Sequence, residues 1–367
     1  MQNGGALEAA EFAERILQII NEGNLTSTYK LALLLSLIDV CMERTAGDAD
    51  QPISIGALAS KMVDLYWQQT LPYPSRGEVL QQSGTGGQAK IVSLIHDFRV
   101  PLEHGHPVGV SQAKVIDPEG YARLVRSIEE QLYRYVLLKL QTVGGTSDPF
   151  IYELPPGADP RGQGSPRLFA GGVRLRPGAA NHLVRFEPLL RPLIQQRWAQ
   201  HIAGLRANSS LHHVYELEEF LFGAERVSLA PITNALRDLQ SGRCFYCRRE
   251  VGRDRHVDHF IPWSRYRDNG LENLVFTDGA CNVQKHAYLA GIEHLERWLE
   301  RFSPDSPIAK TIADIGAQFH WERQPQRTYG AARTAYLYAT PATLFWSQRT
   351  GLHREDLGPV RRLLLAA

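Results

Sequence analysis

Apolar residues recur at helical spacing through the first part of the chain. Four of them between positions 12 and 20 share one helix face, and residues 31–42 carry a denser set. Pro118 suits a first helical turn and Gly144-Gly145 would end a helix, so residues 118–143 predict a long one. Two more helices are predicted at 55–67 and 89–98, which makes the first 145 residues a helical domain.

The pattern changes between residues 146 and 188, where proline and glycine separate short β-type runs such as 150–152 and 172–176. This stretch predicts a linker or a small β-type module. Helical spacing resumes at 189–206, 213–222 and 229–240.

A second change follows at residue 243. Residues 255–261 and 271–276 have the composition of short strands, and residues 278–289 that of a helix. Pro262 prevents the first strand from continuing as an interior strand. Helices are then predicted over 292–302, 308–319 and 329–338.

The predicted fold is therefore mostly α, with a small α+β insertion between helical N-terminal and C-terminal regions. The predicted organisation has five parts: a helical domain (1–145), a Pro/Gly-rich β-type linker or small module (146–188), a helical segment (189–242), a ββα core (243–290) and a helical C-terminal region (291–367).

Charge adds a local feature only, because the net charge is +1. Between residues 161 and 206 there are eight arginines and a single acid, Glu187. A solvated face with helix-end charges would explain this equally well. The alternative is a phosphate-tracking surface, for which Arg174, Arg176 and Arg185 are the candidates.

Composition also bears on the compartment. The first residues lack a cationic stretch followed by an apolar run, so we expect no secretory signal. The longest apolar stretch, 31–42, is too short to cross a bilayer and contains Asp39. A cytoplasmic, reducing setting is expected, with no membrane association, and clustered cysteines there indicate metal or catalysis.

Three of the four cysteines lie within 38 residues. Cys244-x-x-Cys247 can place two thiolates on one tetrahedral ion, and Cys281 can add a third. Asp278, three residues before Cys281, repeats the knuckle spacing and could complete a structural Zn²⁺ site; His256 is the other local candidate.

The pair Asp258-His259 ends the first predicted strand. Histidine suits a general base near neutral pH, and a carboxylate suits Mg²⁺ or Mn²⁺. On the following helix Asp278, Asn282 and Lys285 share a face. Asn282 can offer a carbonyl oxygen to the same cation, and Lys285 can hold a phosphate.

Together these residues resemble the zinc-knuckle form of the HNH, or ββα-metal, endonuclease family. The matching elements are Cys244-x-x-Cys247, Asp258-His259-x-x-Pro262, Asn273-Leu274 and Asp278-x-x-Cys281-Asn282-x-x-Lys285. The resemblance implies that His259 is the general base and that Asp258 and Asn282 bind the catalytic ion. It also implies that Asn273 bridges the loop between the strands and that Lys285 contacts phosphate.

One position departs from the family pattern, because Asp278 stands where a zinc cysteine is usual. Asp278 could serve zinc or the catalytic ion; we favour zinc, since Cys281 would otherwise be a third ligand without a fourth. His256 and His286 flank the site, and His286 is a candidate phosphate contact.

The sequence thus predicts a Mg²⁺- or Mn²⁺-dependent endonuclease that cuts DNA, resembling nucleases of bacterial restriction or phage defence. One alternative is a zinc-stabilised module that binds nucleic acid without cutting. Another is a nuclease effector that is active only with a partner protein of a defence system. A double-strand cut would need two centres, which favours a homodimer.

Overall fold

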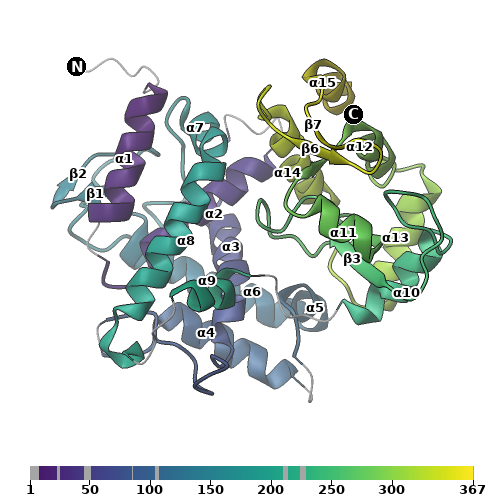
Figure 1. The fold of residues 1–367 in the computed structure, drawn as a ribbon. Coiled ribbons are helices and arrows are strands. Elements are labelled where there is room, and N and C mark those ends of the chain that lie inside the picture. Colours follow the sequence, from purple (N-terminus) through teal and green to yellow (C-terminus); the bar gives the residue numbers. More distant parts are fainter. Residues whose placement is uncertain are drawn as a thin grey trace. The chain divides into compact units, whose positions relative to one another are not determined.

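The computed structural model describes residues 8–22, 25–44, 51–84, 86–103, 107–209, 214–223 and 229–366. The chain divides into two compact units, residues 1–113 with 117–225, and residues 114–116 with 226–367. Helices dominate both units and the sheets are small, so the predicted fold class is confirmed (Figure 1).

The first unit is built from helices. Those of eight or more residues are α1 Ala9–Glu22, α2 Tyr29–Glu43, α3 Ile55–Trp67, α4 Lys90–Arg99, α6 Pro118–Gln131, α8 Glu187–Ala203 and α9 Val214–Phe222. The shorter elements are α7 Ala179–Arg185, the helical turns η2 Gln68–Thr70, η3 Val100–Leu102, η4 Leu132–Val136 and η5 Arg206–Asn208, and the hairpin of β1 Thr142–Val143 and β2 Thr146–Ser147. Helix α5, Val110–Ile116, begins in this unit and ends in the other.

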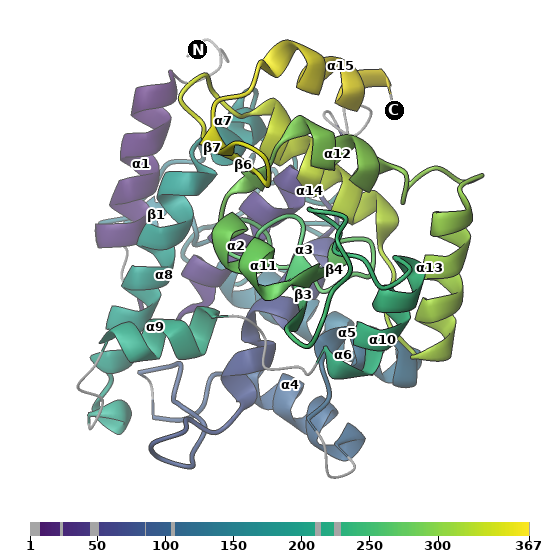
Figure 2. The same ribbon diagram turned by 45° about the vertical axis from the view of Figure 1, so that its right-hand side comes forward.

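Helix α2 forms the centre of the first unit because it is apolar on all sides. Every residue from Leu31 to Met42 is buried, as expected for a helix without a polar face. The acid within this buried stretch, Asp39, accepts a 2.6 Å bond from Arg191 of α8, which also bonds Glu187 at 2.6 Å. Helices α1 and α8 lie side by side in both views (Figures 1 and 2).

The predicted helix over residues 118–143 is shorter than expected. Helix α6 ends at Gln131 and a π-helical turn follows. Gly144 and Gly145 have φ values of 57° and 84°, which turn the chain so that the β-branched pair Thr142-Val143 joins a hairpin instead. The runs around residues 152 and 173 form single bridges, Tyr152 with Leu175 and Val173 with Ile53.

The second unit surrounds a β-hairpin. Its elements are α10 Ala230–Leu239, β3 Arg255–His259, β4 Leu274–Asp278, α11 Gly279–Lys285, β5 Leu289–Ala290, α12 Ile292–Leu299, α13 Pro307–Gln318, α14 Pro325–Leu337, β6 Phe345–Ser347, β7 Gly351–His353 and α15 Leu357–Ala366. Strands β3 and β4 are antiparallel, and α11 packs against both, as Figure 2 shows.

The C-terminal region contains strands that the apolar pattern did not predict. Strand β6 pairs in parallel with β5 and antiparallel with β7. The hairpin and this sheet share a buried aromatic core, in which Trp298 stacks on Phe260 with ring centroids 4.6 Å apart. Arg301 donates to three carbonyls of the β3–β4 loop and of β4, which fixes α12 and its C-terminal turn to the hairpin.

Candidate nuclease and metal site

Asn273 holds the loop between β3 and β4. This fully buried amide accepts a 2.8 Å hydrogen bond from the Ile261 amide and donates to the carbonyls of Ile261 and Asp268 at 3.3 and 3.0 Å. All three of these hydrogen bonds join the Asn273 side chain to main-chain groups of the loop. The loop therefore leaves β3 at a fixed angle just after His259.

His259 ends β3 with one ring nitrogen held in place. Its Nε2 donates to the Asn269 side-chain oxygen at 2.8 Å, which leaves Nδ1 as the nitrogen with a free lone pair. Burial lowers the pKa of His259. The imidazole is therefore neutral near pH 7, the state that a general base requires. Sequence reasoning missed Asn269; its only signal was an amide in the turn that precedes Gly270.

Asp258 points to the other side of β3, into the hairpin's contact with α11. Its Oδ2 accepts a 2.5 Å bond from the Tyr246 hydroxyl and lies 3.0 Å from the Lys285 ammonium. Among the described residues nothing bonds its Oδ1. This oxygen is therefore the one that remains for a cation.

Lys285 is fully buried, which is at odds with the expected phosphate contact. Its ammonium also donates to the His259 carbonyl at 2.8 Å, and burial lowers its pKa. A side chain in this position can fix Asp258 and the end of β3, whereas a phosphate would have to displace protein atoms to reach it.

Asn282 lies over the same face of β3 as Asp258, one turn of α11 before Lys285. Its Nδ2 donates to Nδ1 of His256 at 3.3 Å, and His256 shares the α11-facing side of the strand with Asp258. No hydrogen bond joins Asp258 to Asn282 in the described parts of the chain. The side-chain oxygen of Asn282, like Oδ1 of Asp258, has no partner there, whereas the main-chain carbonyl of Asn282 accepts from the His286 amide.

His256 is oriented by a carboxylate. Its Nε2 donates to Asp254 at 2.9 Å, which leaves Nδ1 as the acceptor that faces Asn282. A Cβ at Gly279 would lie 2.0 Å from Oδ2 of Asp254, so only glycine lets this carboxylate approach the start of α11. A histidine held through one nitrogen by a carboxylate presents the other as a metal ligand.

A second group of ligating side chains lies at the other end of the hairpin. Cys244, Cys247, Asp278 and Cys281 place one ligand atom each within 4.8 Å of one another. Three thiols and a carboxylate oxygen are a donor set that Zn²⁺ accepts in closed sites. His256, the alternative fourth ligand, is not part of this group.

Asp278 divides its two oxygens between two tasks. Oδ1 accepts from the Cys281 amide at 2.8 Å and caps α11, while Oδ2 accepts from the Cys247 thiol at 3.2 Å. Burial raises its pKa, but the bonds from the cysteines outweigh this and hold it below the usual range. Asp278 pairs with Arg255, three positions from the pair Asp258–Val275, or about 10 Å along the strand.

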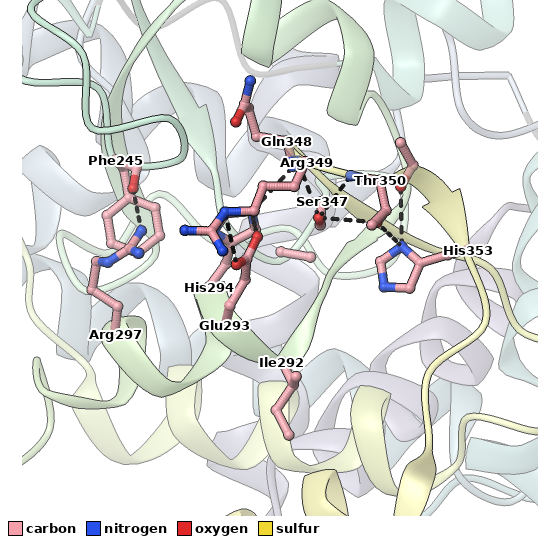
Figure 3. A network of polar contacts seen from close by, with 12 residues as sticks. Phe245, Ile292, Glu293, His294, Arg297, Ser347, Gln348, Arg349, Thr350 and His353 are labelled. Atoms are coloured by element: carbon pink, nitrogen blue, oxygen red, sulfur yellow. Dashed lines mark hydrogen bonds and ion pairs between the residues drawn. The ribbon is translucent and has the colours of Figure 1, made fainter.

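The zinc knuckle, the turn from Cys244 to Cys247, is held in place by neighbouring groups. Cys244 has a pKa lowered to about 6, chiefly by the hydrogen bond from Cys281, whose own pKa is raised. Arg297 of α12 donates to the Phe245 carbonyl at 2.5 Å, a contact drawn in Figure 3. A lowered pKa favours the thiolate, which is the form of cysteine that binds metal ions.

The predicted nucleic-acid contacts fall in different places. Arg174 and Arg185 are exposed in the first unit, and Arg176 is half-buried there against the Pro149 carbonyl and Glu153. His286 is exposed just after α11, with a φ of 46°. The second unit adds a set that sequence reasoning missed, five exposed arginines around the knuckle and β3: Arg243, Arg248, Arg249, Arg253 and Arg255. Their close spacing along the sequence was the available signal.

Comparison with protein families gives two matches. Residues 244–290 match the model of the HNH endonuclease family, and residues 8–103 match a family described as a domain of unknown function (DUF8808). No curated protein and no solved structure matches the chain. Among the described residues no helix is long and apolar enough to span a membrane. The segment 244–290, with its hairpin, α11 and a cysteine-rich cluster that could bind zinc, therefore belongs to the HNH endonuclease family, and its function is of the nuclease type.

Proposed function

We propose that this protein hydrolyses phosphodiester bonds in DNA at the end of β3, with His259 as the general base. One observation carries the proposal: the neutral His259 ring, held through Nε2 by Asn269, ends the strand on which Asp258 keeps an unpaired oxygen. Nδ1 of His259 would take the proton from the attacking water. The oxygen of that water would bond to phosphorus while the P–O bond to the leaving oxygen breaks, and the leaving oxygen would take a proton from solvent water.

The catalytic cation, Mg²⁺ or Mn²⁺, fits the oxygens that the fold leaves free. Oδ1 of Asp258 and the side-chain oxygen of Asn282 would hold this cation. Nδ1 of His256 would offer a third ligand on the same face of the strand. When bound, such an ion stabilises the negative charge that builds up on phosphate. Tyr246 and Lys285 would fix the carboxylate through its other oxygen.

The cysteine cluster is proposed as the structural Zn²⁺ site. It would tie the turn of Cys244–Cys247 to the start of α11, and so set where Asn282 lies. The five exposed arginines near it would contact DNA phosphates, with Arg174, Arg176, Arg185 and His286 as further candidates.

A nicking assay tests the cleavage. Supercoiled plasmid is incubated with Mn²⁺ and wild type, His259→Asn, or His320→Asn, which removes an exposed imidazole of the same unit. We expect the first variant to lose about 10²- to 10⁴-fold in rate, the usual contribution of a general base, and the second to lose nothing. Equal nicking by both variants overturns the assignment. Salt-sensitive DNA binding without nicking in any divalent ion would favour the non-cutting module instead.

The biological role proposed is bacterial restriction or phage defence, and it rests on the resemblance of the HNH centre alone. Phage plating on cells expressing wild type or His259→Asn tests it; equal plating argues against a defence role. A homodimer or a partner protein would supply the second centre that a double-strand cut needs. Two measurements test these alternatives: whether the purified protein alone produces linear plasmid, and whether its mass in solution is that of a monomer or a dimer.

A further inference from the structure

A cavity of about 1060 Å³ lies in the first unit, far along the sequence from the HNH segment. It is lined by the starts of α2 and α4, the end of α6 with η4, and the β1–β2 hairpin. The lining residues include no aspartate and no glutamate. Those that the argument uses are Tyr29, Lys30, Lys90, Tyr135 and Lys139.

Three lysines line this cavity. The chain has 40 basic side chains, and only seven of them are lysines, so three in one cavity is a concentration. Lys30 donates to the Thr142 carbonyl at 3.1 Å. Within the described ranges neither Lys30, Lys90 nor Lys139 has a carboxylate within ion-pair distance. Three of the other lysines do have one: Lys61, Lys114 and Lys285.

These unpaired charges act on one another. The pKa of Lys30 is lowered, first by burial and then by the charge of Lys139. The Thr142 carbonyl accepts from Lys30, but within the described ranges no carboxylate offsets the charge of Lys30 or of Lys139. A multivalent anion between them would relieve the repulsion and replace lost hydration.

The helix ends add to the positive potential. Helices α2 and α4 begin at Tyr29 and Lys90, both of which line the cavity, and neither has a side-chain cap at its N-terminus. Uncapped amides at the start of a helix favour negative charge. At the start of α4 the Tyr29 hydroxyl accepts from the backbone amides of Ile91 and Lys90.

The cavity is larger than a phosphate needs, and it carries an aromatic surface. Tyr135 is 43% exposed and lies among the lining residues, where its ring is open to stacking. We propose that this cavity binds a nucleotide with two or more phosphates, the lysines holding the phosphates and Tyr135 the base. The cations gather in one hollow of bounded volume, whereas a nucleic-acid track would spread them along a surface.

Isothermal titration of the full chain tests this, in EDTA so that no divalent ion links nucleotide to the HNH segment. The probes are ATP, GTP, CTP, UTP, ADP, adenosine, inorganic pyrophosphate and a 12-nucleotide single-stranded DNA. We expect at least one nucleoside triphosphate to bind, and the corresponding nucleoside to bind about tenfold or more weakly.

Matched variants locate the site. The double variant Lys90→Gln/Lys139→Gln should weaken triphosphate binding about tenfold or more, whereas Lys310→Gln, an exposed lysine elsewhere, should leave it unchanged. Tyr135→Ala should weaken triphosphate binding and leave pyrophosphate binding unchanged.

Three outcomes overturn the proposal. One is that no nucleotide binds, or that the double variant binds as wild type does. Another is that pyrophosphate binds as tightly as every triphosphate, which would make the cavity a plain anion site. The third is that the double variant weakens the binding of the single-stranded DNA only, and that no nucleotide competes with this DNA for the protein.

Discussion

The ammonium of Lys285 lies 3.0 Å from Oδ2 of Asp258, and neither side chain is more than 11% exposed. This pair joins α11 to β3 at the place where the proposed chemistry occurs. We infer from this contact and from its burial that Lys285 positions Asp258.

Replacing Lys285 by methionine should destabilise the protein strongly. The change leaves a buried carboxylate without its cation, which costs about 3–5 kcal/mol in similar sites. Lys310→Met, at an exposed lysine, is the control. Urea unfolding of both variants measures the difference. The double variant Asp258→Asn/Lys285→Met should recover part of the loss, and equal midpoints for the two single variants would show that the pair is not formed.

Asn269→Leu should slow cleavage by about 10- to 100-fold, because His259 loses the acceptor that fixes its ring. Asn269→Asp should restore much of the rate, since a carboxylate accepts the same bond. A negative charge there also stabilises the imidazolium and raises the pKa of His259, so the acidic limb of the rate profile moves to higher pH. A pH–rate profile of nicking gives both readings. Wild-type rates in Asn269→Leu would contradict the positioning role.

Asp278→Cys should bind Zn²⁺ at least as well as wild type and still cut DNA, because it supplies a fourth thiolate to the cluster. Asp278→Ala should lose zinc, and also the cap of α11, worth about 1 kcal/mol. Metal analysis of the purified variants and the nicking assay measure these effects. A zinc-loaded Asp278→Cys that no longer cuts would place Asp278 at the catalytic ion instead.

We expect the protein to lose stability in acid because of the buried His294. Burial lowers its pKa from 6.5 to about 4, among the charges of Glu293, Arg297, Arg349 and Glu355. Its Nε2 accepts from the Gln348 amide, and its Nδ1 is buried without a partner; Figure 3 shows it beside the β6–β7 turn.

Between pH 6.5 and 4 the unfolded chain binds more protons at this histidine than the folded chain does. The His294 contribution is therefore fully present above pH 6.5 and falls as the pH falls toward 4. From pH 7 to pH 5 wild type should lose about 2 kcal/mol more than His294→Gln. Urea unfolding at the two pH values decides, and parallel losses would mean that His294 titrates normally.

The side chains of Arg249 and Arg253 are exposed and form no hydrogen bond or ion pair with the described residues. If they contact phosphates, replacing either with glutamine should reduce the salt slope of DNA binding by about one contact. Fluorescence anisotropy with a labelled duplex at several salt concentrations measures the slope. Arg174→Gln, in the first unit, tests the other predicted arginine surface. A reduced salt slope in Arg174→Gln, with an unchanged slope in the Arg249 and Arg253 variants, would show that DNA contacts the first-unit arginines instead.

The sequence by itself determined the features that depend on neighbours in the chain. The helical spacing predicted α1 to α4, and the order of Cys244, Asp258, Asn273 and Cys281 identified the HNH segment. Knuckle spacing, strand alternation and helix faces are local geometry, so about 50 residues were enough.

Tertiary structure decided which side chains meet across distance. Lys285 was expected to contact phosphate. It is buried because α11 packs against strands β3 and β4. Tyr246, Asn269 and the three lysines of the cavity come from separate elements whose packing no local pattern specifies. Strands β5 to β7 were missed for the same reason, since two- and three-residue strands have too few positions to show a period and form only when distant segments pair.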